Sequence, residues 1–166
     1  MARLREGPTT VRFYQVAGSS PDIALTGILF KVVEQGSRAC LLALDATHVK
    51  RLDEMLWRYP LDRFLPHGPW DGPDPQRQPV LITLQPDDCN GASVLVVAAS
   101  RGVDKPEQFD MVVDFVDPRE PVANARDRYR RYQTLGCVME YWIQSPEGRW
   151  TQKESRQIEK KESSHS

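Results

Sequence analysis

The chain has 166 residues, of which 40% are apolar and 27% are charged, and its formal net charge is -1. This length and composition fit one globular domain with its own core, and they exclude a disordered or fibrous chain. A near-neutral charge argues against a protein that grips long stretches of nucleic acid with its whole surface. Apolar runs stay far below the ~20 residues that span a bilayer, and the basic N-terminus precedes no apolar stretch, so we expect a cytoplasmic protein without a membrane segment or secretory signal.

The first part of the chain predicts a strand, a helix and a second strand. Residues 11–16 are typical of a strand, and the turn 18–22 leads into a helix. Gly36 is suited to end this helix, because glycine readily adopts the left-handed conformation at a helix C-terminus. The continuous apolar run 39–44 predicts a strand that is buried on both faces. The apolar residues expected on one face of the helix are Ile23, Ile28, Leu29, Val32 and Val33.

A second helix follows this strand. Asp45 or Thr47 can serve as its N-cap, and Tyr59-Pro60 is expected to end it. Residues 67–79 contain four prolines and two glycines, so they predict a long loop without a regular element. The apolar residues that recur at helical spacing are Val49, Leu52, Met55 and Leu56.

The second half of the chain predicts further strands and one more helix. Strands are expected at 80–84, 93–99 and 111–116, followed by a helix over 119–135 that Gly136 ends. Residues 137–144 and 149–153 predict a terminal hairpin, and residues 154–166 a disordered tail that follows one domain over 1–153. Alternating strands and helices with continuous apolar strands predict an open three-layer α/β/α sandwich around a mostly parallel sheet.

Signatures of nucleotide, metal and catalytic sites are missing from the sequence. The turn after the first strand matches neither G-x-G-x-x-G nor G-x-x-x-x-G-K-[ST], and Asp22 would repel an anion there. The histidines lack zinc-binding spacing and the cysteines form no Cys-x-x-Cys pair, which indicates plain thiols in a reducing compartment. We therefore expect no cofactor, no metal and no catalytic residue. The histidines and cysteines are His48, His67, His165, Cys40, Cys89 and Cys137.

The segment 51–67 places aromatic residues and prolines directly after a helix. Trp57 and Phe64 can each bury ~150 to 250 Å² of surface area, so if they lie on the surface they would form an anchor patch for another protein. Alternatively, both rings fold back into the core under the end of the helix. The spacing leaves both interpretations open.

The late helix carries a local excess of positive charge. Arg126 and Arg130 are one turn apart with Tyr129 beside them, which suits an acidic peptide that ends in a carboxylate, because arginine donates to a carboxylate in a bidentate manner. Single-stranded nucleic acid could also use stacked tyrosines and arginines. A solvated helix face with inward-packed tyrosines is the alternative. The charges are Arg119, Arg126, Arg128, Arg130 and Arg131 against Glu120 and Asp127, a balance of +3.

Several of these segments occur, in the same order, in one known family. They are Val11–Tyr14, Arg51–Trp57 with Phe64–His67, Val112–Phe115, and Ala125–Tyr129 with Tyr132 and Gly136. Over residues 9 to 143 the chain resembles the chi subunits of bacterial DNA polymerase III. The resemblance implies a Rossmann-like fold without a nucleotide site, and a non-catalytic accessory role in DNA replication.

The resemblance also implies two partners and their sites. Residues matching Trp57, Phe64 and Pro66 receive the psi subunit of the clamp loader, and a helicase is a possible competitor for that face. Residues matching Val116, Arg126, Tyr129 and Arg130 hold the C-terminal tail of single-stranded DNA-binding protein, so nucleic acid is contacted mainly indirectly. A Rossmann-like nucleotide-binding enzyme and a direct single-stranded DNA binder are the alternatives.

The sequence departs from the family pattern in two places. Val122 stands where relatives often carry a lysine, which removes one charge from the expected tail site. The chain also continues past the usual end, from about Ser145 to Ser166. This extension leaves open whether the cationic face of the late helix is exposed or partly covered.

Overall fold

The computed structural model describes residues 7–17, 21–58, 63–86 and 90–153. Four sequence-based predictions concern residues outside these ranges: the residues 18–20 of the first turn, the helix end at Tyr59-Pro60, the thiol of Cys89, and the tail over 154–166.

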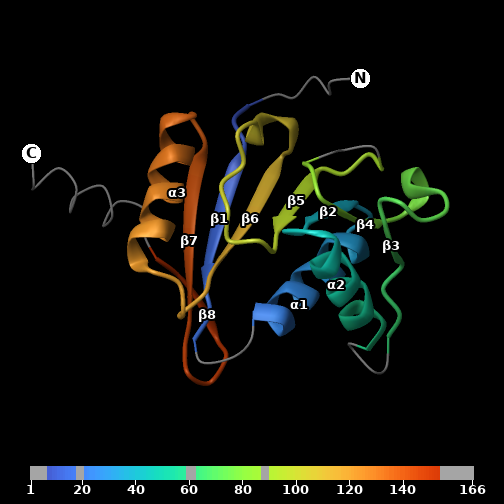
Figure 1. Cartoon of the computed structure of the whole chain (residues 1–166). Helices are drawn as coiled ribbons and strands as arrows, with labels where there is room; N and C mark the ends of the chain where they lie inside the picture. The colour runs from blue at the N-terminus through green and yellow to red at the C-terminus, as the bar shows by residue number, and fades with distance from the viewer. Residues whose placement is uncertain (1–6, 18–20, 59–62, 87–89, 154–166) are drawn as a thin grey trace, which may run out of the picture.

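A large sheet forms the centre of the protein (Figure 1). Within the described residues it has eight strands in the order β3-β4-β2-β5-β6-β1-β7-β8, and every neighbouring pair is parallel except β7 with β8. The strands are β1 (Thr10–Gln15), β2 (Ala39–Leu42), β3 (His67–Pro69), β4 (Val80–Thr83), β5 (Val94–Val97), β6 (Met111–Val116), β7 (Val138–Gln144) and β8 (Trp150–Lys153).

Helices cover both faces of this sheet. Helix α1 (Pro21–Glu34) and helix α2 (Ala46–Arg58) pack on one face, whereas helix α3 (Val122–Thr134) packs on the other, as Figure 1 shows. Short 3-10 turns lie at Pro75–Arg77 and Pro106–Gln108. The prediction of an α/β sandwich around a mostly parallel sheet is therefore confirmed.

Strand alternation divides the core into two clusters. Val11 and Phe13 of β1 point toward α3, whereas Tyr14 and Val16 point toward the side that α1 and α2 cover. Strands β2, β4 and β5 are buried on both faces, which explains why all their residues are apolar except Thr83 at the end of β4.

Three helix ends follow the predicted signals. The Asp45 carboxylate accepts a hydrogen bond from the backbone N–H of His48 at 2.8 Å, which makes Asp45 the N-cap of α2. Gly36 and Gly136 have φ values of +79° and +84°. At each of them the chain makes the paired backbone bonds of a Schellman motif, with Ser37 donating to Val32 and Cys137 donating to Tyr132.

Three predictions about the elements are corrected. Residues 67–69, expected to be loop, form the edge strand β3, where a proline is tolerated because its missing N–H faces no neighbouring strand. Helix α3 begins at Val122 rather than 119, because the preceding residues form a turn in which Asp117 accepts from Arg119 N–H. On α1, Ile23 is exposed and Leu25 is buried instead.

The C-terminal hairpin is confirmed, and it contains the described part of the extension. Strand β8 adds to the free edge of β7, with Trp142 opposite Gln152 and Gln144 opposite Trp150. The Trp150 ring packs edge-on against Tyr14 at 5.0 Å, on the face of the sheet away from α3. The described part of the extension therefore lies at the sheet edge, beside α3 and not over it.

Candidate functional site

Trp57 and Phe64 lie on the surface at the end of α2. Each is 61% exposed, and their ring centroids are 5.2 Å apart. Pro66, in the loop that leads to β3, is partly buried. We call Trp57, Phe64 and Pro66 the aromatic face. Of the two interpretations that the spacing left open, the structure favours the surface patch over rings that fold back into the core.

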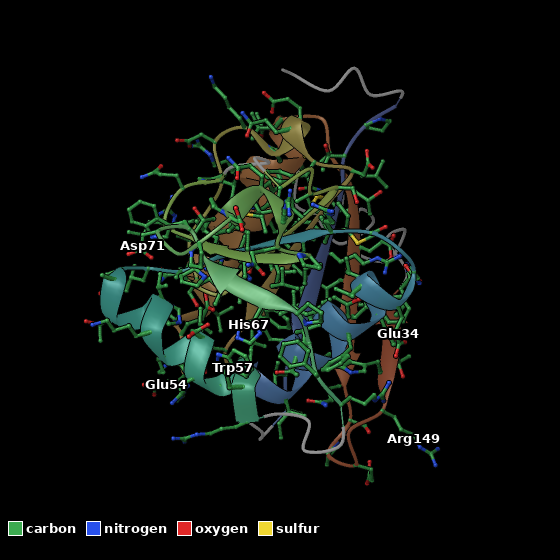
Figure 2. The ribbon with its side chains drawn as sticks, turned by 90° about the vertical axis from the view of Figure 1, so that its right-hand side faces the viewer. Glu34, Glu54, Trp57, His67, Asp71 and Arg149 are labelled. Atoms are coloured by element: carbon green, nitrogen blue, oxygen red, sulfur yellow. The ribbon has the colours of Figure 1, made fainter. Side chains whose placement is uncertain are left out.

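His67 packs beneath the aromatic face, on the side toward the core. Its side chain is fully buried and lies 5.0 Å from the Trp57 ring, edge to face (Figure 2). One imidazole nitrogen, Nδ1, lies 2.7 Å from the carbonyl oxygen of Leu65, and the other, Nε2, lies 3.1 Å from Asp53 Oδ1. These contacts connect the loop that carries Phe64 to helix α2, which carries Trp57, and so hold the two exposed rings in place.

The arginines of α3 and its preceding turn divide into paired and free groups. Arg119 pairs with Asp117, Arg131 with Asp104, and Arg128 with Asp114 and Glu120. Arg126 and Arg130 are exposed and form no ion pair with any residue in the described part of the chain. Three of the five arginines behind the predicted local charge of +3 are therefore compensated by acidic partners. The two that are not, Arg126 and Arg130, are the two that the sequence singled out.

Tyr129 and Val116, which the sequence assigned to the same site as these two arginines, both pack in the core cluster beneath α3. Tyr129 is largely buried, and the centroid of its ring lies 5.3 Å from that of Phe13 and 6.3 Å from that of Tyr141. Val116, at the end of β6, packs against the same cluster. We call Val116, Arg126, Tyr129 and Arg130 the arginine face. The inward packing of Tyr129, one of the sequence-based alternatives, is correct, and Tyr129 contributes a wall rather than an exposed ring.

Sequence reasoning missed Tyr141 of β7, which belongs to the same cluster. Its ring is partly buried, and its hydroxyl donates to Gln15 Oε1 at 2.7 Å. Burial is the main cause that raises the pKa of Tyr141, with the charges of Glu120 and Asp114 adding to it. Tyr141 therefore remains a neutral hydroxyl beside the arginine face. Its place opposite Phe13 in a parallel pair was hidden because strand order cannot be read from local periodicity.

A buried ion-pair network fixes α3 on the sheet. Both oxygens of Asp114 accept hydrogen bonds from Arg128 at 3.0 Å, and Arg128 also donates to Glu120 at 2.8 Å. Burial raises the pKa of Asp114 to about 6, although Arg128 acts against this shift. Burial alone would lower the pKa of Arg128, but its hydrogen bonds with Glu120 and Asp114 outweigh this effect and raise it. The sequence contained a sign of this network, because Asp114 is the one charged residue in the otherwise apolar strand β6.

A cavity of about 370 Å³ lies at the carboxyl edge of the sheet, where Rossmann-like folds bind ligands. Its lining includes Asp22 at the start of α1, and Asp22 pairs with Arg51 at 3.0 Å. Asp117 and Arg119, which pair with each other, also line it. The cavity thus presents mutually compensated charges. Among the described residues, no three acidic, histidine or cysteine side chains are grouped closely enough to hold a metal ion.

None of the helices in the described ranges is long and apolar enough to cross a membrane. The fold defines the class of protein: an open α/β domain with a mostly parallel sheet. Its surface carries two exposed aromatic rings at the end of α2 and two exposed arginines of α3 that form no ion pair in the described ranges.

The chain belongs to the family described as DNA polymerase III chi subunit, HolC, whose sequence model matches residues 9–140. It is similar to the probable DNA polymerase III subunit chi of Rickettsia prowazekii (strain Madrid E), with 25% identity over 76% of this chain and 81% of the relative. It is also similar to the DNA polymerase III subunit chi of Escherichia coli (strain K12), with 29% identity over 61% of this chain and 70% of that protein. Membership places the chain among the subunits of a multi-protein replicase.

Proposed function

We propose that this chain is a non-catalytic accessory subunit of DNA polymerase III that links the clamp loader to single-stranded DNA-binding protein. In this proposal the aromatic face binds psi, and the arginine face binds the acidic C-terminal tail of single-stranded DNA-binding protein. The observation that carries the proposal is that Arg126 and Arg130 alone, among the five arginines at 119–131, lack an ionic partner in the described part of the chain.

The aromatic face has the character of an interface anchor. Two exposed rings at van der Waals range offer a large apolar area to a partner, and they rest on a base held by His67. Aromatic residues of this kind dominate the energetics of many interfaces. A psi subunit is the proposed occupant, and a helicase that uses the same face would compete with it.

The arginine face suits a peptide that ends in an aromatic residue with a free carboxylate. A buried terminal phenylalanine contributes ~1.5 to 3 kcal/mol and two charge-assisted hydrogen bonds ~1.5 to 3 kcal/mol each, before ordering costs are subtracted. A net ~8 kcal/mol corresponds to a Kd of about 1 μM. Weak contacts of this size suit a partner with several tails, because avidity holds the complex while each tail exchanges.

The two faces belong to opposite parts of the sheet order. The aromatic face adjoins β3, the first strand, whereas the arginine face adjoins β1 and β7, the sixth and seventh. A subunit that binds one partner at each end acts as a bridge.

The test is the binding of a fluorescent acidic peptide that ends in Asp-x-Pro-Phe with a free carboxylate, measured at two salt concentrations. We expect micromolar, salt-sensitive binding that Arg126→Ala weakens at least about tenfold, because a charge-assisted pair contributes ~1.5 kcal/mol or more. Arg149→Ala, which removes an exposed arginine in the β7–β8 turn, is the matched control and should bind like wild type. A folded wild-type protein that does not bind this peptide would refute the arginine-face assignment.

Two additional measurements separate the alternatives. Tight binding of a single-stranded oligonucleotide with a steep salt slope, without any partner protein, would favour direct DNA binding instead. A concentration-dependent rise in melting temperature with ATP or NAD would favour a nucleotide-binding enzyme.

A further inference from the structure

The C-terminal hairpin brings one more cation to the side of the sheet that α3 covers. In the antiparallel pairing of β7 with β8, Lys153 lies directly opposite Tyr141. Directly opposed residues of an antiparallel pair point to the same face. Tyr141 packs in the cluster that contains Tyr129, so Lys153 emerges on the same side as the arginine face.

The orientation of Lys153 is fixed by the other face of β8. Trp150 packs against Tyr14 on the opposite side of the sheet, where Trp142 also stacks on Tyr14 at 6.2 Å. A one-residue slip in register would expose this tryptophan and turn every side chain of β8 over. The packing of Trp150 against Tyr14 therefore places Lys153 on the face of the sheet that α3 covers.

The charge of Lys153 is available for a ligand. Lys153 is partly exposed and pairs with no acidic group in the described ranges. The acidic groups behind α3, Asp114 and Glu120, are both bonded to Arg128. A ligand carboxylate beside Tyr141 would thus meet an uncompensated ammonium group. Lys153 lies past residue 140, where the match to the chi family model ends.

We propose that Lys153 is a third cation of the arginine face, and that the β7–β8 hairpin forms one border of the surface that receives an acidic peptide. This inference rests on the proposed function of the arginine face. It extends that face beyond the residues taken from the family resemblance, and it offers a positive charge in a chain whose residue 122 is a valine. Figure 1 shows that the β7–β8 hairpin forms the edge of the sheet nearest to α3.

The experiment compares peptide binding by wild type, Lys153→Gln, Lys153→Glu and Arg126→Ala at low and moderate salt. Because exposed ion pairs are weak, we expect Lys153→Gln to raise the Kd about two- to fivefold and Lys153→Glu about tenfold, with a smaller salt dependence in both. Arg149→Gln, which removes a cation from the turn of the same hairpin, controls for a general loss of charge and should raise the Kd less than Lys153→Gln.

The outcomes separate the two proposals. If wild type binds, Arg126→Ala weakens binding, and Lys153→Gln equals Arg149→Gln, the role of Lys153 is refuted while the arginine face stands. If the folded wild type does not bind the peptide, both proposals fail.

A second measurement reads proximity instead of affinity. Carbodiimide couples a peptide carboxylate to a lysine amine only when the two groups lie in contact, so we expect Lys153 to be the main coupled lysine after proteolysis and mass spectrometry. Coupling that spreads equally over Lys31, Lys50 and Lys105 would overturn the proposal.

Discussion

Asp114 is a carboxylate in the middle of an otherwise apolar strand, and its burial has a consequence for stability. Its pKa is raised from 3.8 to about 6 by burial, which outweighs the hydrogen bonds from Arg128. The folded protein thus holds this proton more tightly than the unfolded chain does. The ionised carboxylate opposes folding, and its unfavourable contribution appears as the pH rises from about 4 through 6.

Replacement of Asp114 by asparagine should remove this pH dependence. Relative to Asp114→Asn, we expect wild type to lose up to about 3 kcal/mol of unfolding free energy between pH 4 and pH 7. Urea unfolding of both proteins across this range measures the difference. Parallel stability curves would contradict the prediction, because they would mean that Asp114 titrates equally in the folded and unfolded chains.

Neighbouring residues at the end of α2 should respond very differently to truncation. Trp57 is exposed, whereas Leu56 is fully enclosed in the core. We expect Trp57→Ala to change the unfolding free energy by less than about 1 kcal/mol, and Leu56→Ala to cost ~2 to 5 kcal/mol. Chemical denaturation checks both values. A large loss for Trp57→Ala would mean that the tryptophan is part of the core and is not a surface anchor.

At the scale of elements, two glycines have opposite roles. Gly136 has a φ of +84° and ends α3, whereas Gly27 lies inside α1 with ordinary helical backbone. In neither case would an added Cβ meet another atom within 4 Å, so only the backbone preference differs. We expect Gly136→Ala to destabilise the protein by ~1 kcal/mol and Gly27→Ala to stabilise it by ~0.5 to 1 kcal/mol. Thermal unfolding tests the signs, and equal signs would contradict the argument.

The elements could be predicted from sequence where the signal is local. Asp45 caps α2 and Gly36 and Gly136 end α1 and α3, because caps depend on residues within one turn. Strand β3 was missed because its proline and glycine read as a turn, and only its place at the sheet edge makes a strand possible.

The candidate sites depend more on contacts between distant residues. The sequence singled out Arg126 and Arg130, which are exposed, and left open whether Trp57 lies on the surface. It did not reveal the pairing of Arg128 with Asp114, which comes from another element. Tyr141 and Lys153 were missed for the same reason, since their place near α3 follows from strand order. Side-chain partners across the sheet cannot be read from periodicity along the chain.

At the scale of the whole molecule, the two faces should act independently. The aromatic face lies near β3 and the arginine face near β7, with five strands between them in the sheet order. Substitutions that are far apart and share no partners have additive effects. We therefore expect Trp57→Ala to leave the Kd for the acidic peptide within about twofold of wild type, as fluorescence titration would show. A larger change would indicate that the sheet couples the two faces.

The position of β1 in the sheet determines when the protein can fold. Thr10 pairs with Met111 on one side and with Val138 on the other, so the first strand finds its neighbours 101 and 128 residues later in the chain. At a synthesis rate of ~5 to 20 residues per second, β1 waits roughly 5 to 25 s for these partners. Contacts of such long sequence separation also slow the folding of the complete chain. The β6-β1-β7 part of the sheet, although it contains the earliest strand, is therefore completed only after β7 has been synthesised, and until then an unpaired strand is open to aggregation or to a chaperone.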